Sequence, residues 1–110
     1  PATKETKKII NKNSIKYFPD GAVISNSARG DMIDDDAMVE ALKSGKIFSL
    51  GLDVYNGEPN IHPEYLTLPN VYVLPHLGSS TKKTRTAMAD LAVTNILNFF
   101  KNGECENTVN

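Results

Sequence analysis

Short apolar runs alternate with amphipathic segments along this chain. Residues 22–27, 47–52 and 71–74 are mostly apolar and are flanked by polar or turn-forming residues, which predicts three buried strands. Residues 34–43 carry carboxylates at the start, a lysine at the end and Gly45 beyond, as expected of a helix. Residues 80–101 repeat apolar side chains at helical spacing and predict one long helix. Strands that alternate with helices predict a parallel sheet of α/β type.

The start of the chain is harder to interpret. Residues 3–10 predict a short helix, with Thr3 and the Glu5-Thr6 pair as its N-terminal signals, and residues 14–18 predict another turn or two of helix before Pro19-Asp20-Gly21 interrupts the chain. Three strands are few for a parallel sheet, and nearly continuous apolar strands need cover on both faces. Since the chain also begins at Pro1 without methionine, we expect it to be one part of a longer protein.

Composition narrows the class of protein. The 110 residues are 40% hydrophobic and 23% charged with a formal net charge of −1, which fits one ordinary soluble domain rather than a disordered chain. No apolar run approaches the roughly 20 residues of a membrane span, and no basic excess favours nucleic acid. Cys105 is the single cysteine, so that no intrachain disulfide can form. We expect a reducing compartment, the cytoplasm, and neither membrane nor nucleic acid as a partner.

Each predicted strand is followed by a polar residue that can do chemistry. These are Arg29, Asp53 and His76, and Glu58 follows Asp53 on the same loop. Taken singly, each has an ordinary structural interpretation: a turn arginine, a loop-capping aspartate, a solvent-exposed glutamate or a satisfied structural histidine. In an open parallel sheet, however, the carboxyl ends of the strands share one edge, where ligands bind. The sequence therefore predicts that these side chains meet at one crevice.

This set suits a substrate that carries a carboxylate beside a carbonyl or hydroxyl carbon. The guanidinium of Arg29 would hold the carboxylate through two parallel hydrogen bonds. His76 would exchange a proton with the substrate oxygen, and Glu58 is the candidate partner for its other ring nitrogen. Hydride transfer needs a carrier such as a nicotinamide cofactor. Asp53 could accept a hydrogen bond from that cofactor.

Other chemistries find less support in the sequence. His62 and His76 lie in unrelated loops without ligand spacing, so that no metal site is expected, and His62 is interpreted as a surface residue. The serines after His76 lack the Gly-x-Ser-x-Gly elbow of a nucleophile, and Cys105 is far away in sequence. The phosphate-binding pattern Gly-x-Gly-x-x-Gly is absent from the 110 residues.

Four motifs in order and spacing resemble the D-isomer-specific 2-hydroxyacid dehydrogenases: NSARG at 26–30, GLDVY at 51–55, EP at 58–59 and PHLG at 75–78. The resemblance covers essentially this whole chain and well under half of a family member. It implies the C-terminal part of a doubly wound, Rossmann-like dinucleotide-binding domain without its Gly-rich first half. Residues 1–110 would end in the long helix at about 80–101 and a tail that returns to the substrate domain. Residues 74–81, with Thr84 and Arg85, are most similar to the glyoxylate/hydroxypyruvate reductase branch.

The resemblance also implies roles residue by residue. Arg29 matches the arginine that binds the substrate carboxylate, and Glu58 and His76 match a carboxylate–histidine pair in which His76 is the acid and base. Positions implied to line NAD or NADP are Thr6, Ser27, Ala28, Arg29, Asp53, His76, Gly78 and Ser79.

The resemblance further implies a small 2-hydroxy or 2-oxo acid as substrate and a homodimer. We expect the isolated chain to be inactive, because the phosphate-binding turn is missing. The alternative is a non-catalytic NAD-binding or protein-interaction module of the same fold.

Overall fold

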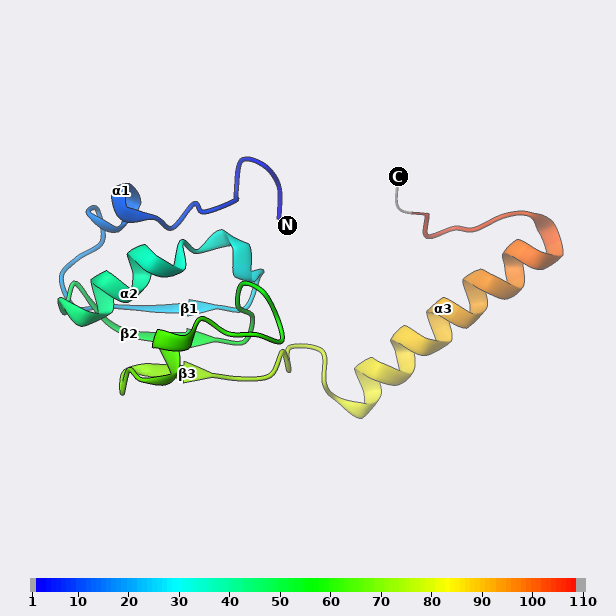
Figure 1. Ribbon diagram of the computed structural model, residues 1–110. Helices are drawn as coiled ribbons and strands as arrows, with labels where there is room; N and C mark the ends of the chain where they lie inside the picture. Colours follow the sequence, from blue (N-terminus) through cyan, green and yellow to red (C-terminus); the bar gives the residue numbers. More distant parts are fainter. Residues whose placement is uncertain (1, 109–110) are drawn as a thin grey trace. The chain divides into compact units, whose positions relative to one another are not determined.

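The computed structural model describes residues 2–108, which fall into two compact units (Figure 1). The first unit runs to Gly78 and contains a sheet with helices packed on it. Its elements are α1 (Lys12–Ile15), β1 (Ala22–Asn26), the 3-10 turn η1 (Gly30–Met32), α2 (Asp35–Lys43), β2 (Ile47–Leu52), η2 (Pro63–Leu66) and β3 (Val71–Val73). The second unit begins at Ser79 and contains α3 (Lys82–Asn102).

The three strands form one parallel sheet in the order β1-β2-β3, which confirms the predicted sheet. In the register, Asn26 lies beside Leu52, and Leu52 lies beside Val73. The hydrogen-bond pattern continues just past the strands, since the Asp53 amide donates to the Asn26 carbonyl at 3.0 Å. All three strands therefore end together, and the loops that leave them start from one edge.

The core lies between α2 and the sheet. Met38 of α2 packs there with Ile47 and Leu50 of β2, and all three side chains are fully buried. By contrast, each strand also carries a large apolar residue that is about two-thirds exposed: Val23, Phe48 and Tyr72. On β1, Val23 is exposed because successive side chains of a strand point to opposite faces. On β2, the register with β1 is irregular at Phe48, since Ala22 pairs with Ile47 and Val23 with Ser49, so that Phe48 is the extra residue there.

The prediction of a helix at residues 3–10 is wrong. The segment is a series of turns in which Lys8 has a φ of +50°, and Ile10 forms an isolated parallel bridge with Ile33. The Ile10 amide donates to the Met32 carbonyl at 3.0 Å, and the Ile10 carbonyl accepts from the Asp34 amide at 2.8 Å. Pairing with a distant segment takes the backbone groups that a local helix would need, so that tertiary structure overrides local propensity.

The other helices are close to expectation. Helix α1 starts earlier than the predicted 14–18 because Asn11 caps it in a reciprocal capping box with Ser14. Asp34 caps α2 by accepting from the Ala37 amide. Helix α3 begins after its N-cap Thr81 and ends at Gly103, whose φ of +70° is the left-handed C-cap conformation. Among residues 2–108, no helix combines the length and apolar character that a bilayer crossing requires.

The buried face of β2 should dominate the stability of the sheet unit. We expect Leu50→Ala to lower the free energy of unfolding by about 3 kcal/mol, because it opens a cavity under α2 where Leu50 has no exposed surface. Phe48→Ala, at an exposed position of the same strand, is the matched control and should change it by less than about 1 kcal/mol. Urea denaturation measures both, and equal losses would contradict this account of the core.

Candidate functional site

The turn after β1 is built by Asn26, whose side chain is only 7% exposed. Its Nδ2 donates to the Arg29 carbonyl at 2.8 Å, and its Oδ1 accepts from the Ala28 amide at 3.0 Å. The amide side chain thus fixes the backbone of residues 27–29. The Arg29 guanidinium is exposed and donates through Nη1 to the Ala28 carbonyl at 2.7 Å. Most of its five N–H donors remain for a bound anion.

Glu58 and His76 meet at the same edge of the sheet. Glu58 Oε2 lies 2.9 Å from His76 Nδ1, and Glu58 Oε1 accepts the Tyr55 amide at 3.0 Å. The hydrogen bond to His76 is the main reason that the pKa of Glu58 lies below its ordinary value, and the Tyr55 amide adds to it. An ionised Glu58 accepts from Nδ1, so that the proton on this nitrogen is fixed and Nε2 is left for a ligand. The sequence predicted this pairing, whereas its catalytic role stays a prediction.

Asp53 holds the turn that carries His76. Its Oδ1 accepts the Leu77 amide at 2.6 Å, and its Oδ2 accepts the Gly78 amide at 2.8 Å. His76 has a φ of +56°, a left-handed conformation that costs a side-chain-bearing residue about 1–2 kcal/mol. The two charge-assisted hydrogen bonds offset that strain. Asp53 was expected to contact a cofactor, and the structure gives it this second task.

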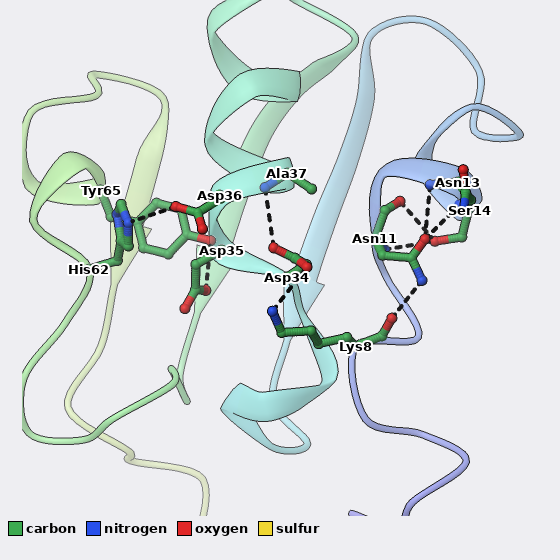
Figure 2. Close-up of polar contacts among 10 residues, drawn as sticks. All are labelled: Lys8, Asn11, Asn13, Ser14, Asp34, Asp35, Asp36, Ala37, His62 and Tyr65. Atoms are coloured by element: carbon green, nitrogen blue, oxygen red, sulfur yellow. Dashed lines mark hydrogen bonds and ion pairs between the residues drawn. The ribbon is translucent and has the colours of Figure 1, made fainter.

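The loop that carries Glu58 is anchored to the start of α2 (Figure 2). The Tyr65 hydroxyl donates to Asp35 Oδ1 at 3.0 Å. The Asn56 side chain also interacts with this carboxylate and opposes the rise in its pKa. Burial raises the pKa of Asp35, and burial together with Asp35 raises the pKa of Tyr65 well above its ordinary range. The loop between these two contacts is therefore held against α2.

The expectation that His62 is a surface residue is wrong. Its side chain is 24% exposed, its Nε2 lies 3.4 Å from Asp36 Oδ1, and its ring meets the Tyr65 ring edge-on with centroids 5.6 Å apart. Figure 2 shows His62 beside Tyr65 and Asp36. The proline and polar residues that flank His62 in the sequence gave no sign of this packing. His62 thus belongs to the anchor of the loop. Within residues 2–108, no three histidine, cysteine or acidic residues are placed to share a metal ion.

Not all of the predicted cofactor positions are brought together. Ser27 and Ala28 lie in the turn that Asn26 fixes, and Gly78 lies against Asp53. Thr6 belongs to the N-terminal turns, where its side chain hydrogen-bonds with Thr3. Ser79 starts the second unit, which is described separately from the sheet. The cofactor roles of these residues remain predictions.

Two residues of the motif at 26–30 shape the site although the sequence assigned them no role: Asn26 and Gly30. Asn26 ends an apolar run directly before a turn, which is the position of an asparagine that hydrogen-bonds to the backbone two residues on. Gly30 follows Arg29 and lies against the backbone of Tyr55 and Asn56. No pattern along the chain reveals that contact, since its partners are 25 residues apart.

Removing the Asn26 side chain should loosen the Arg29 turn. Asn26→Ala leaves the Ala28 amide and the Arg29 carbonyl without their partner, so that we expect a loss of about 2 kcal/mol in the free energy of unfolding. Asn102→Ala, at the exposed end of α3, is the control and should have little effect. Denaturant unfolding measures both, and an unchanged Asn26 variant would show that this turn is held by something else.

The Glu58–His76 hydrogen bond should be lost in acid. Since the folded pKa of Glu58 is lower than the ordinary 4.5, the bond is fully formed above about that pH and disappears as the pH falls through the lowered value. Carbon-13 NMR of the Glu58 carboxyl follows this titration directly. In His76→Ala, the pKa of Glu58 should rise toward 4.5, and an unchanged titration would show that the Tyr55 amide alone sets it.

Comparison with known proteins identifies the family of this chain. The sequence model described as "D-isomer specific 2-hydroxyacid dehydrogenase, NAD binding domain" matches residues 1–78. Similar proteins include a glycerate dehydrogenase of Hyphomicrobium methylovorum, 45% identical over 84% of this chain and 29% of that protein. Another is glyoxylate reductase 1 of Saccharomyces cerevisiae, 44% identical over 94% of this chain and 30% of its own.

The fold is also shared with solved structures. An NADPH-dependent glyoxylate/hydroxypyruvate reductase from Sinorhizobium meliloti, solved in complex with NADP and malonate, matches with a TM-score of 0.92 and 39% identity. The match covers 99% of this chain and 34% of that one, so that the chain spans about a third of the length of such relatives. These likenesses confirm the Rossmann-like fold. The chain belongs to the D-isomer specific 2-hydroxyacid dehydrogenase family, and it matches the NAD binding domain of that family.

Proposed function

We propose that this chain forms the catalytic edge of an NAD(P)-dependent dehydrogenase that interconverts a D-2-hydroxy acid and a 2-oxo acid. The observation that carries the proposal is the Glu58–His76 pair, at 2.9 Å, on loops that leave the sheet edge where the Arg29 turn also begins. An oriented imidazole and an exposed guanidinium are the two groups that such a substrate needs. The family and its dehydrogenase and reductase members support the same reaction.

The residues at the sheet edge fit the nicotinamide end of the cofactor. Asp53 uses each carboxylate oxygen once, so that both oxygens keep acceptor capacity for a carboxamide or ribose donor. Because Gly78 has no side chain, Asp53 Oδ2 stays open to a ligand. A Cβ at Gly78 would stand 3.2 Å from this oxygen. Ser27 and Ala28, in the turn that Asn26 fixes, would also line the cofactor. When bound, the cofactor supplies or accepts the hydride.

The side chains of this chain would manage the charge and the proton. Arg29 would bind the substrate carboxylate through its fork of N–H donors, which also orients the neighbouring carbonyl carbon. His76 Nε2 would give a proton to the carbonyl oxygen as the hydroxyl forms, and would take it back in the reverse direction. Glu58 would keep the ring oriented through Nδ1 and stabilise its protonated form.

The finer identity of the substrate follows from the relatives. Glyoxylate and hydroxypyruvate reductases recur among the similar proteins, so that we propose a small substrate of this kind, with NAD or NADP as cofactor. We also propose a homodimer in the cytoplasm, without nucleic acid or membrane as partner. Exposed apolar side chains on β1–β3 and on α3 support self-association. The 110 residues by themselves should turn over little, because they contain no Gly-rich phosphate-binding turn.

Kinetics of the complete protein that contains this chain tests the proposal. His76→Ala should lower kcat by roughly 10²–10⁴-fold in NAD(P)H oxidation with glyoxylate or hydroxypyruvate, which is the usual contribution of general acid catalysis. Arg29→Lys should raise KM and lower kcat, because lysine lacks the planar fork.

Arg85→Lys, an exposed position on α3, is the matched control for the arginine change and should leave both constants near wild type. Near-wild-type rates in His76→Ala would exclude the proposed acid and base. Cofactor binding without any turnover of 2-oxo acids by the wild-type protein would favour the non-catalytic binding module.

A further inference from the structure

Gly30 makes the closest backbone approach at the site. A Cβ built on Gly30 would overlap the carbonyl group of Tyr55 and the amide nitrogen of Asn56. The φ of Gly30 lies outside the left-handed region, so that space and not backbone torsion demands glycine. Gly30 directly follows Arg29 and opens η1, whereas Tyr55 and Asn56 lie on the loop that leaves β2. The loops of two neighbouring strands therefore touch at a point with no room for a side chain.

Hydrogen bonds connect Tyr55, on the loop side of this contact, to His76 through Glu58. Tyr55 donates its amide to Glu58 Oε1 at 3.0 Å, and the other oxygen of the same carboxylate lies 2.9 Å from His76 Nδ1. The carbonyl that a Cβ would overlap belongs to the Tyr55–Asn56 peptide, whereas the amide that Glu58 accepts belongs to the preceding peptide, and the two share the Tyr55 Cα. A displacement of this carbonyl would therefore rotate the backbone at Tyr55, move its amide, and remove one of the two hydrogen bonds that orient the Glu58 carboxylate. No side chain of Gly30 is involved, and the effect passes through backbone position alone.

The loop has little freedom to move away as a whole. At its start, the Asp53 amide donates to the Asn26 carbonyl at 3.0 Å. Beyond the contact, the Tyr65 hydroxyl donates to Asp35 Oδ1 at 3.0 Å, and the Asn56 side chain interacts with the same carboxylate. Because the loop is tied on both sides of Tyr55, an added methyl group at Gly30 would be accommodated by rotation of the backbone about the Tyr55 Cα, which moves the Tyr55 amide as well.

We propose that Gly30 is a positioning residue for the Glu58–His76 pair: the absent side chain lets the Arg29 turn seat the Tyr55 amide against Glu58. The assignment deepens the proposed function, since it links the turn that bears the substrate-binding arginine to the acid–base pair. It gives this glycine a task beyond folding. The orientation of the carboxylate then depends on the packing of two loops, and not only on the pair itself.

The test compares two glycine variants in the chain, followed by carbon-13 NMR of the Glu58 carboxyl. Gly30→Ala should shift the pKa of Glu58 upward toward its ordinary value and weaken protection of the Tyr55 amide from hydrogen exchange. Gly51→Ala is the matched control, because a Cβ there would lie 3.6 Å or more from its neighbours, an ordinary contact. It should leave both readings at wild-type values.

Circular dichroism and thermal unfolding accompany each titration. Where Gly30→Ala is too unstable, trimethylamine N-oxide favours the folded state and the titration is repeated in it. A folded Gly30→Ala with the wild-type Glu58 titration overturns the proposal. A variant that stays unfolded in the osmolyte, beside a folded Gly51→Ala, assigns Gly30 to the fold and also overturns it.

The titration needs neither substrate nor cofactor, so that it is independent of the proposed reaction. If His76→Ala kept full activity in the complete protein, the proposed function would fail while the positional link of Gly30 to Glu58 could still hold. If Gly30→Ala left Glu58 unchanged and His76→Ala abolished turnover, only the role of Gly30 would be lost.

Discussion

The parallel register of the sheet is the constraint on which the site depends. Asn26, Leu52 and Val73 lie side by side at the ends of β1, β2 and β3, so that the loops following them start within one or two strand spacings of each other. No side chain of the site has to reach across the molecule. The buried face of β2 under α2 holds this register, which means that the apolar core and the polar edge are two consequences of one pairing pattern.

Polar side chains at this edge hydrogen-bond to the backbone of the loops that carry the site. Asn26 fixes the Arg29 turn, Asp53 receives the two amides beyond His76, and Glu58 receives the amide of Tyr55. Each of these groups is thereby oriented before any ligand arrives. Orientation fixed in advance lowers the entropy cost of binding and of reaction, which is the usual advantage of a rigid site on a sheet edge. The left-handed backbone of His76 persists because Asp53 holds the peptides that follow it.

The spacing of apolar residues along the chain was sufficient to predict the three strands and the helices over 35–43 and 82–102, because each of these elements repeats its apolar residues regularly. It failed at residues 3–10, where pairing of Ile10 with Ile33 decides the conformation, and at His62, whose packing on Tyr65 is a contact in space. Glu58 and His76 were predicted to lie together because the carboxyl ends of parallel strands share one edge of the sheet. The same reasoning could not anticipate the close contact of Gly30, which depends on how two loops pack.

The decisive experiment is a crystal structure of the complete protein with its cofactor and oxamate, an unreactive analogue of a 2-oxo acid. We expect the oxamate carboxylate on the Arg29 guanidinium and its carbonyl oxygen within hydrogen-bond distance of His76 Nε2, with Nδ1 still on Glu58. Oxamate bound away from Arg29, or a His76 ring that presents neither nitrogen to it, would refute the proposed roles of Arg29 and His76.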